Sequence, residues 1–440
     1  MKSNLLHLHR RPALYCLMLG ISSVFAQQPP ARQAPAPGAQ NRPPATTPPA
    51  TPAAPQAPTP PQPIAPTPNP VRPQSPQNLS EPLPGLTFEE AVQFADGQEE
   101  FRHVETPATG LGPIFNDVSC VACHNAGGTG GAGRSTVTRF GRTTDGVFDP
   151  LESLGGSLLQ ARSINPAVRE TVPAVANTVA RRITTPLFGA GLIEAIPDNT
   201  ITAGLLRPKP RGITGKVSIV TDVVSGQNRV GRFGWKAQQA TLLAFSADAY
   251  RNEMGITNRF FPTENAPNGN AALLARFKTT SDPEDKIDPA DGKGDVDRAA
   301  DYMRLLAPPP QNGLSASALA GQRFFATLDC AACHTPTMTT GRSAIAALSG
   351  KTVNLYSDLL LHDMDSLGDG IAQGTAGPRE MRTAPLWGVS VRPLWLHDGR
   401  ARTIDDAVRA HDGEARDSRD RYTLLSATER RQLLDFLDAL

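Results

Sequence analysis

The pattern Cys-x-x-Cys-His occurs twice in the chain, at residues 120–124 and again at residues 330–334. This pattern is the attachment signature of a c-type haem. Two thiols at this spacing reach the two vinyl groups of one porphyrin and form thioethers, and the histidine that follows then lies under the ring with a nitrogen aimed at the iron. The sequence therefore predicts two covalently bound haem c groups. The attachment residues are Cys120, Cys123, Cys330 and Cys333, and the iron ligands are His124 and His334.

Other uses of the cysteines are less consistent with the sequence. The chain has five cysteines, and only Cys16 lies outside the two motifs, so no pair remains for a structural disulfide. A thioredoxin-like redox pair also uses Cys-x-x-Cys, but the histidine directly after both motifs argues against it. A zinc site needs further ligands at short spacing, which neither motif has.

The first 26 residues have the features of a secretory signal peptide. Lys2, Arg10 and Arg11 give a positive start, an apolar run follows at 13–25, and Ala26 ends a cleavage site. A periplasmic protein is expected, because c-type haem is attached on the outer side of the bacterial inner membrane. The alternative is an uncleaved signal that tethers the protein to the membrane.

Residues 27–84 are expected to form a disordered, extended linker. The stretch from Pro29 to Pro84 contains half of the 42 prolines of the chain and few large apolar side chains. Such a segment cannot bury enough surface to offset the entropy of ordering. It is either a spacer that holds the body away from a membrane or a dispensable tail.

From residue 85 the sequence predicts a mainly α fold with little β structure, because c-type folds wrap short helices round one haem. Thr87 and Glu90 form a capping-box pattern at the start of the first helix. Further helices are predicted at 240–254, 296–306, 316–328 and from about 427 to 440, and a strand at 216–224 pairs in a small hairpin with the segment around 232. We expect two cytochrome c-like domains, at 85–307 and 308–440.

Three features concern other ligands. The formal net charge of +1 gives no reason to expect a nucleic acid partner. The acidic segment 285–297 is either a turn and helix cap or a loop that binds calcium. The Gly-rich loop at 127–133 lacks the Lys-Ser/Thr of a phosphate loop, so close packing of its backbone over a haem edge is expected instead.

The two halves of the chain resemble each other. Phe115 lies five residues before Cys120, and Phe325 lies five residues before Cys330. Downstream, Thr-Pro-Leu-Phe-Gly at 185–189 corresponds to Ala-Pro-Leu-Trp-Gly at 384–388. A diverged repeat of one cytochrome-like unit accounts for both correspondences.

Two stretches of the second half carry a resemblance to known proteins. Residues 382–388 have the sequence Arg-Thr-Ala-Pro-Leu-Trp-Gly, and 396–404 have Leu-His-Asp-Gly-Arg-Ala-Arg-Thr-Ile. They resemble the C-terminal signature of bacterial di-haem cytochrome c peroxidases and MauG-type enzymes. Together with matches at 110–124, 182–197, 231–237, 361–364 and 396–415, the chain more closely resembles the di-haem oxidoreductase, putative peroxidase family, sometimes labelled thiol oxidoreductase.

The resemblance implies roles for two further residues, His411 and His397, and residue type alone suggests one for Trp235 among the three tryptophans. In the resembled peroxidases the second haem takes its sixth ligand 14 residues beyond the His-Asp-Gly histidine, and His411 occupies that position after His397. Those relatives have Met or Tyr there, so bis-histidine ligation and a lower potential are expected here. The alternative is a His411 at the surface, in the polar run 411–414, and His362 and Met364 are the competing ligands. His397 is expected to support the haem pocket, and Trp235 to lie between the haems unless it is an ordinary core residue.

The first haem has no obvious sixth ligand, since His103 is the only free histidine in its half. An open iron suits peroxide or oxygen chemistry, which also needs an acid near the distal oxygen. Glu194 lies among apolar residues and is the candidate acid, with Arg182 as the second candidate catalytic residue; the alternative is a Glu194 that faces solvent or pairs with Arg181 or Arg182.

The predicted function is that of an exported di-haem peroxidase. Peroxide is reduced at the N-terminal haem, and electrons pass through the C-terminal haem from a small periplasmic cytochrome c or cupredoxin. The first alternative is MauG-like or oxygenase-like oxidation of a small external substrate. The second is a cytochrome that transfers electrons without catalysis.

Overall fold

Helices begin where the sequence places a capping residue before a run of helix formers. The computed structural model describes residues 79–210, 212–278, 286–311 and 313–440. Thr87 and Glu90 form the predicted capping box of α1, and Ser315 and Ser426 cap two later helices. The helices are α1 (Phe88–Arg102), α2 (Cys120–Cys123), α3 (Ala190–Glu194), α4 (Asp198–Ala203), α5 (Leu242–Met254), α6 (Ala271–Phe277), α7 (Asp295–Leu305), α8 (Ala316–Thr327), α9 (Ile404–Arg409), α10 (Arg416–Thr423) and α11 (Ala427–Asp438).

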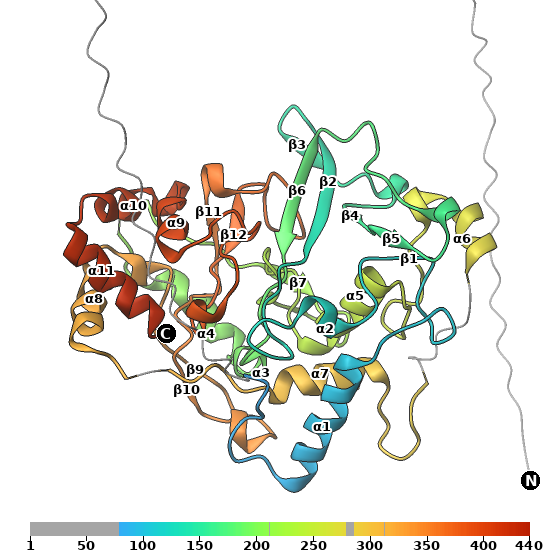
Figure 1. Ribbon diagram of the computed structural model, residues 1–440, viewed down its shortest axis with the longest axis horizontal. Helices are drawn as coiled ribbons and strands as arrows, with labels where there is room; N and C mark the ends of the chain where they lie inside the picture. The colour runs from blue at the N-terminus through green and yellow to red at the C-terminus, as the bar shows by residue number, and fades with distance from the viewer. Residues whose placement is uncertain (1–78, 211, 279–285, 312) are drawn as a thin grey trace, which may run out of the picture. The chain divides into compact units, whose positions relative to one another are not determined.

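The main sheet is built on one long strand, which pairs antiparallel with three others. Its partners are β3, β4 and β6, while the remaining strands form two-stranded ribbons (Figure 1). The strands are β1 (Ile114–Phe115), β2 (Thr136–Thr144), β3 (Val147–Asp149), β4 (Leu158–Leu159), β5 (Arg162–Ser163), β6 (Thr178–Ile183), β7 (Ile219–Thr221), β8 (Asn228–Val230), β9 (Met338–Thr339), β10 (Thr352–Val353), β11 (Leu361–Asp363) and β12 (Glu380–Arg382).

The expectation of little β structure was wrong, because the described chain is a mixture of helices and small sheets. Strand β2 contains Arg139, Gly141 and Arg142 and shows no clean alternation of buried and exposed residues, so its sequence lacks the usual strand signal. Most other strands have only two or three residues. The predicted hairpin is confirmed as β7 and β8, which pair in antiparallel register.

The apolar core is divided among three main clusters. Helices α1 and α7 pack side by side near the first motif, and α8 packs on α11 near the second (Figure 1). Phe325, Phe436 and Tyr422 belong to the cluster around the second motif. The apolar stripe predicted for the last helix therefore is core, as expected.

The two related glycine turns lie close to each other in the centre of the fold. Gly189 and Gly388 both have positive φ, at 70° and 61°. A Cβ at Gly189 would meet the Trp387 ring at 2.8 Å and Pro308 at 2.9 Å. Glycine is therefore required both by the backbone conformation and by the close approach.

The ordered body begins earlier than the linker prediction allowed. Leu79 and Leu83 are buried in the largest core cluster, and the Leu79 N–H donates to the carbonyl of Gly127 at 2.8 Å. The predicted signal peptide (1–26), Cys16 and the linker up to residue 78 lie outside the described residues. The domain division at 307/308 stays a prediction. Within the described ranges, no helix has the length and apolar composition needed to cross a membrane.

Candidate functional site

The first motif forms a single helical turn that is fixed at both ends. Ser119 caps α2 by accepting a hydrogen bond from the Ala122 N–H, and the His124 N–H donates to the Cys120 carbonyl. Nδ1 of His124 lies 3.2 Å from the carbonyl of Gly131, and the backbone of Thr185 is a second partner of the ring. Burial lowers the pKa of His124 to about 4, so the ring is neutral, as an iron ligand must be.

The Gly-rich loop packs on this motif rather than forming an anion site. A Cβ at Gly133 would lie 2.0 Å from the Cys123 carbonyl, and a Cβ at Gly131 would lie 1.9 Å from the Ala126 carbonyl. Only glycine allows these approaches. The predicted role in close backbone packing is consistent with this geometry.

A cluster of charged residues lies beside Cys123. Glu253, at the end of α5, accepts a hydrogen bond from Asn116 Nδ2 at 2.7 Å, and its charge helps to raise the pKa of Cys123. Burial raises the pKa of Glu253 above its usual value, although the nearby Arg139 opposes this. Asp248, one and a half helical turns earlier, also has its pKa raised by burial.

Arg139 brings a buried cation to the same place. Its pKa is lowered to about 10, mainly by burial, and its Nε has no hydrogen-bond partner within the described chain. The register of β2 and β6 pairs Arg139 with Ala180 and Val137 with Arg182, so both arginines lie on one face of the sheet. A buried guanidinium with an unsatisfied N–H can hold an anionic group such as a porphyrin carboxylate.

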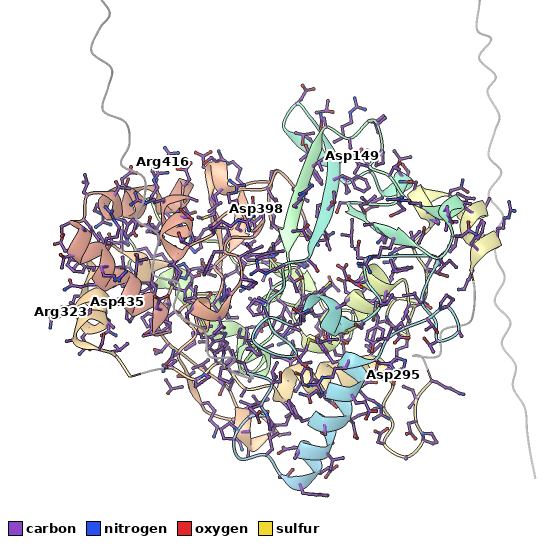
Figure 2. The ribbon with its side chains drawn as sticks, viewed as in Figure 1. Asp149, Asp295, Arg323, Asp398, Arg416 and Asp435 are labelled. Carbon is purple, nitrogen blue, oxygen red and sulfur yellow. The ribbon has the colours of Figure 1, made fainter. Side chains whose placement is uncertain are left out.

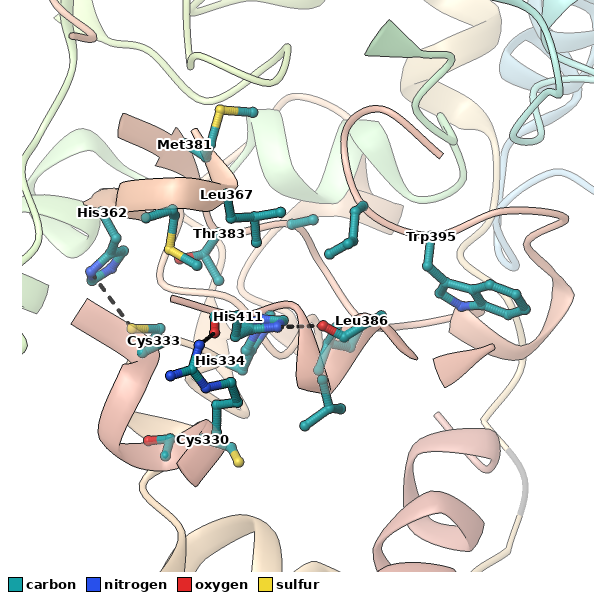
Figure 3. A pocket seen from close by; sticks show the side chains of 18 of the residues that line it. Cys330, Cys333, His334, His362, Leu367, Met381, Thr383, Leu386, Trp395 and His411 are labelled. Atoms are coloured by element: carbon teal, nitrogen blue, oxygen red, sulfur yellow. Dashed lines mark hydrogen bonds between the residues drawn. The ribbon is translucent and has the colours of Figure 1, made fainter. Parts of the chain in front are cut away.

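The second motif opens into a cavity with a volume of about 200 Å³. The cavity is mostly apolar, and Figure 3 shows two histidine rings at its centre, next to the cysteines of the motif. Residues from the whole second half line it, joined by Ile213 and Trp235 from the first half. The predicted site residues among the lining are Cys330, Cys333, His334, His397, His411 and Trp235.

His334 and His411 face each other with ring centroids 6.4 Å apart. An imidazole nitrogen binds a metal at about 2 Å, and the ring centroid lies roughly 1.2 Å behind it, so two imidazoles on opposite sides of one metal have centroids about 6.4 Å apart. Nδ1 of His334 lies 3.0 Å from the Tyr356 carbonyl, and Nδ1 of His411 lies 2.7 Å from the Ala407 carbonyl. Both rings therefore keep Nε2 free, and burial lowers the pKa of both. The separation fits one metal ion between them.

Two arginines in this cavity have no counter-charge. Arg382 and Arg392 bond to backbone carbonyls, and neither forms an ion pair within the described residues. Burial lowers the pKa of each to about 10, and Arg392 Nε has no hydrogen-bond partner there. Buried charges are costly unless an opposite charge satisfies them. The two carboxylates of a haem supply that charge, so the donors present fit the group.

Trp235 links this cavity to the region of the first motif. Its ring packs edge-on against His397 at 6.3 Å, and its Nε1 donates to the Ile183 carbonyl at 2.9 Å. It lines the second-motif cavity and also a smaller neighbouring cavity that contains Thr185. The backbone of Thr185 forms a hydrogen bond with His124. The predicted position between the two haem sites is consistent with these contacts.

Glu194 has a different setting from the one expected. Its Oε2 accepts from Arg304 Nε at 2.7 Å, and its Oε1 accepts from the Leu242 N–H at 2.7 Å. The ion-pair partner of Glu194 is therefore Arg304, and not Arg181 or Arg182 as in the alternative to a catalytic role. Glu194 lines neither cavity. The geometry favours an anchor that joins the start of α5 to α7 over a catalytic acid.

Arg182 is also committed to a structural contact. Its guanidinium bonds to Asp369 at 2.7 Å and to Gln373 at 2.6 Å, and it lines neither cavity. Asp369 also pairs with Lys236 at 3.0 Å. These three groups form a buried ionic network rather than an open catalytic position.

The competing ligands have other partners. His362 is held between Asp358 at 3.0 Å and Glu414 at 2.6 Å. His103 is half exposed and lies 4.0 Å from Glu105. Met364 lines the second cavity, but His411 is the residue that faces His334.

The calcium prediction has no support in the described part of the acidic segment. Asp288, Asp291 and Asp295 all lie within 4 Å of Arg298. Across the residues that the structure describes, no cluster of three or more His, Cys, Asp or Glu side chains is arranged for a metal ion.

Sequence reasoning missed Glu253, Arg139, Arg382 and Arg392. The carboxylates Asp248 and Glu253, on the helix that also carries the buried Leu242, Ala244 and Met254, were an available signal for the first pair. Charged residues in an apolar setting are functional candidates when they are buried. Nothing in the sequence indicated that Arg139 would be turned inward.

Comparisons with known proteins agree with the chemistry of the site. The model of the family described as di-haem oxidoreductase, putative peroxidase matches residues 167–440, more than half of the chain. No curated protein matches.

Solved structures give weaker likenesses. Hydrazine synthase of Kuenenia stuttgartiensis is 15% identical, with 88% of this chain and 100% of that chain covered and a TM-score of 0.37. The diheme peroxidase BthA of Burkholderia thailandensis is 14% identical, with 79% and 86% covered and a TM-score of 0.31. A MauG-like protein associated with microbial copper homeostasis is 15% identical, with 58% and 89% covered and a TM-score of 0.30. On the family match, the chain belongs to the di-haem oxidoreductase, putative peroxidase family and is an oxidoreductase with two haem groups.

Proposed function

We propose that the protein is an exported di-haem c-type peroxidase. Cys120 and Cys123 hold one haem and Cys330 and Cys333 the other, each through two thioether bonds. Hydrogen peroxide is reduced at the first site. Electrons enter at the second site from a small periplasmic electron-transfer protein of the cytochrome c or cupredoxin type.

One observation carries this proposal, the difference between the two motif histidines. His334 has a second histidine opposite it, with ring centroids 6.4 Å apart, so both residues would hold an iron placed between them. For His124 the ring contact found within the described residues is with Phe101, while His103 is half exposed and His362, His397 and His411 line the second cavity. Only an iron with a free axial position can bind peroxide.

The residues near the first motif suit proton transfer. A haem supplies an iron that can bind peroxide and exchange single electrons. Glu253 takes the proton from one peroxide oxygen and delivers it to the other, because burial moves its pKa toward neutral pH and Asn116 fixes its carboxyl group. Arg139 provides a fixed positive charge that stabilises the ionised form of Glu253.

The residues of the second site suit electron relay. His334 and His411 would hold the iron of a haem bound here, and Arg382 and Arg392 would balance the charge of its carboxylates. Trp235 contacts His397 in this cavity and also lines the smaller cavity that contains Thr185, a backbone partner of His124. It therefore provides an aromatic bridge between the two sites. The apolar lining of this cavity would keep water away from a bound haem.

The test combines spectroscopy with one substitution. The ferric protein should give one high-spin and one low-spin EPR signal. Glu253→Gln keeps the shape of the side chain but cannot carry the proton, so kcat/KM for peroxide should fall at least about 100-fold with both signals unchanged. Glu170→Gln is the matched control, because Glu170 is a buried carboxylate with raised pKa that binds the backbone N–H groups of Gln160 and Asn268. Two low-spin irons that do not respond to peroxide would exclude the proposal.

A further inference from the structure

A tyrosine and a glutamate form an isolated polar pair in the core beside the first motif. Tyr250 on α5 is 1% exposed, and its Oη donates to Oε1 of Glu100 on α1 at 2.6 Å. Tyr250 belongs to an apolar cluster with Phe115, Met254 and Val296, against which Cys120 packs. The pair therefore lies next to an attachment cysteine of the first haem.

Burial changes the proton affinity of both groups. It raises the pKa of Tyr250 well above its usual value and that of Glu100 to about 6. The other charged groups that act on Glu100 are Asp295 on α7, whose place is shown in Figure 2, together with Glu105 and His103. At neutral pH Glu100 is ionised and is a stronger base than an exposed carboxylate.

The packing of the core does not require this pair. A phenol and a carboxylate lose water on burial, and apolar groups of the same shape would be about as stable. A hydrogen bond from a phenol to a buried base has a chemical consequence, however. The phenol can give up an electron at moderate potential only if its proton has somewhere to go, and Glu100 accepts it without any movement of heavy atoms.

We propose that Tyr250 is an internal one-electron donor to the first haem, with Glu100 as the acceptor of its proton. The inference rests on the proposed peroxidase function. Peroxide takes two electrons and two protons to become two waters, and Tyr250 supplies one of these electrons before the second site can deliver it. The O–H bond of Tyr250 breaks, its proton passes to Glu100 Oε1, and a neutral phenoxyl radical remains. An electron from the second haem and the proton on Glu100 later restore Tyr250.

Two other tyrosines lack this arrangement and serve as controls. Tyr302 is fully buried and packs against Phe101, which contacts the His124 ring, but its Oη donates to the carbonyl of Thr129. A carbonyl cannot take up the proton. Tyr422 donates to Asp405, but that carboxylate is already paired with Arg409 at 2.7 Å, and this tyrosine belongs to the cluster of the second motif.

The experiment is rapid freeze-quench EPR of the ferric di-haem protein after mixing with hydrogen peroxide. A tyrosyl radical should form, and it should narrow when the protein carries ring-deuterated tyrosine. Tyr250→Phe should lower the radical yield at least about tenfold, while Tyr302→Phe and Tyr422→Phe leave it within twofold. The yield in the unchanged protein should fall as the pH drops through about 6, because protonated Glu100 cannot accept.

Glu100→Gln keeps the hydrogen bond and removes the base, so it tests the same idea if Tyr250→Phe does not fold. Its radical yield should fall at least fivefold at pH 8. A radical that persists in both variants would overturn the proposal. A peroxide-induced change of the haem spectrum with no tyrosyl radical would also overturn it and leave the peroxidase function intact. No response of either haem to peroxide would instead count against the peroxidase function.

Discussion

At the scale of single residues, His411 determines how the two haem sites differ. Replacing His411 with Ala removes the ring that faces His334, and in the proposed attachment Cys330 and Cys333 would still hold the haem. The low-spin ferric EPR signal should therefore convert to high-spin, with the haem content per chain unchanged. The control is His103→Ala, since that ring is half exposed, and its spectrum should equal that of the parent. A low-spin signal that survives in the His411 variant would show that another residue is the ligand.

Arg392 is the residue whose charge should most affect the second haem. Its guanidinium has no ion-pair partner among the described side chains, so its charge acts on whatever occupies the cavity. Arg392→Leu should lower the reduction potential of the second haem, because a nearby cation favours the extra electron of the reduced state. A spectroelectrochemical titration measures this shift. Arg323→Leu, at an exposed position of α8 (Figure 2), should leave the potential unchanged, and an equal shift in both variants would contradict the assignment.

At the scale of elements, helix α5 carries Asp248, Tyr250 and Glu253 and depends on how its first turn is held. Thr241 caps it, and Glu194 adds a bond to the Leu242 N–H and an ion pair with Arg304. Glu194→Gln should destabilise the protein by about 1–2 kcal/mol, because it weakens a charged hydrogen bond and removes an ion pair. Thermal unfolding of the holo-protein measures this loss. The kcat/KM for peroxide should change less than threefold. A 100-fold loss would instead show that Glu194 is the catalytic acid of peroxide reduction.

The elements also show what the sequence can predict. Capped helices follow local rules, so Thr87 and Glu90 were sufficient to place the start of α1. Strand β2 and the inward turn of Arg139 depend on pairing with β6, which lies about forty residues later in the chain, and no local pattern reports it. His411 was named through the resemblance to the di-haem peroxidases, and the structure places its ring opposite that of His334; its role as a ligand stays a prediction. The environment of Glu194 was not predicted, because its partner Arg304 lies on α7, which is more than a hundred residues away in the sequence.

At the scale of the whole molecule, a buried ionic network joins the two halves of the chain. Asp369 pairs with Arg182 of β6 and with Lys236, and all three side chains are at most 4% exposed. Asp369→Asn leaves two buried cations without a counter-charge. This should destabilise the protein by about 3–5 kcal/mol. The exposed pair of Asp420 with Arg419 is the control, and Asp420→Asn should cost less than about 1 kcal/mol.

The pH dependence of the stability loss in the Asp369→Asn variant shows whether the loss comes from the missing charge or from altered packing. Burial already lowers the pKa of Lys236 to about 8, and loss of Asp369 lowers it further. Consider the pH range between the Lys236 pKa of the folded variant and that of the folded parent. In this range the unfolded chains and the folded parent keep Lys236 protonated, but the folded variant does not. The free energy of unfolding of the variant therefore rises with pH while that of the parent stays constant. The difference in free energy of unfolding should therefore be larger at pH 6 than at pH 8. A difference that is the same at both values would mean that Asp369 acts through packing, and that the charges of Arg182 and Lys236 are balanced elsewhere.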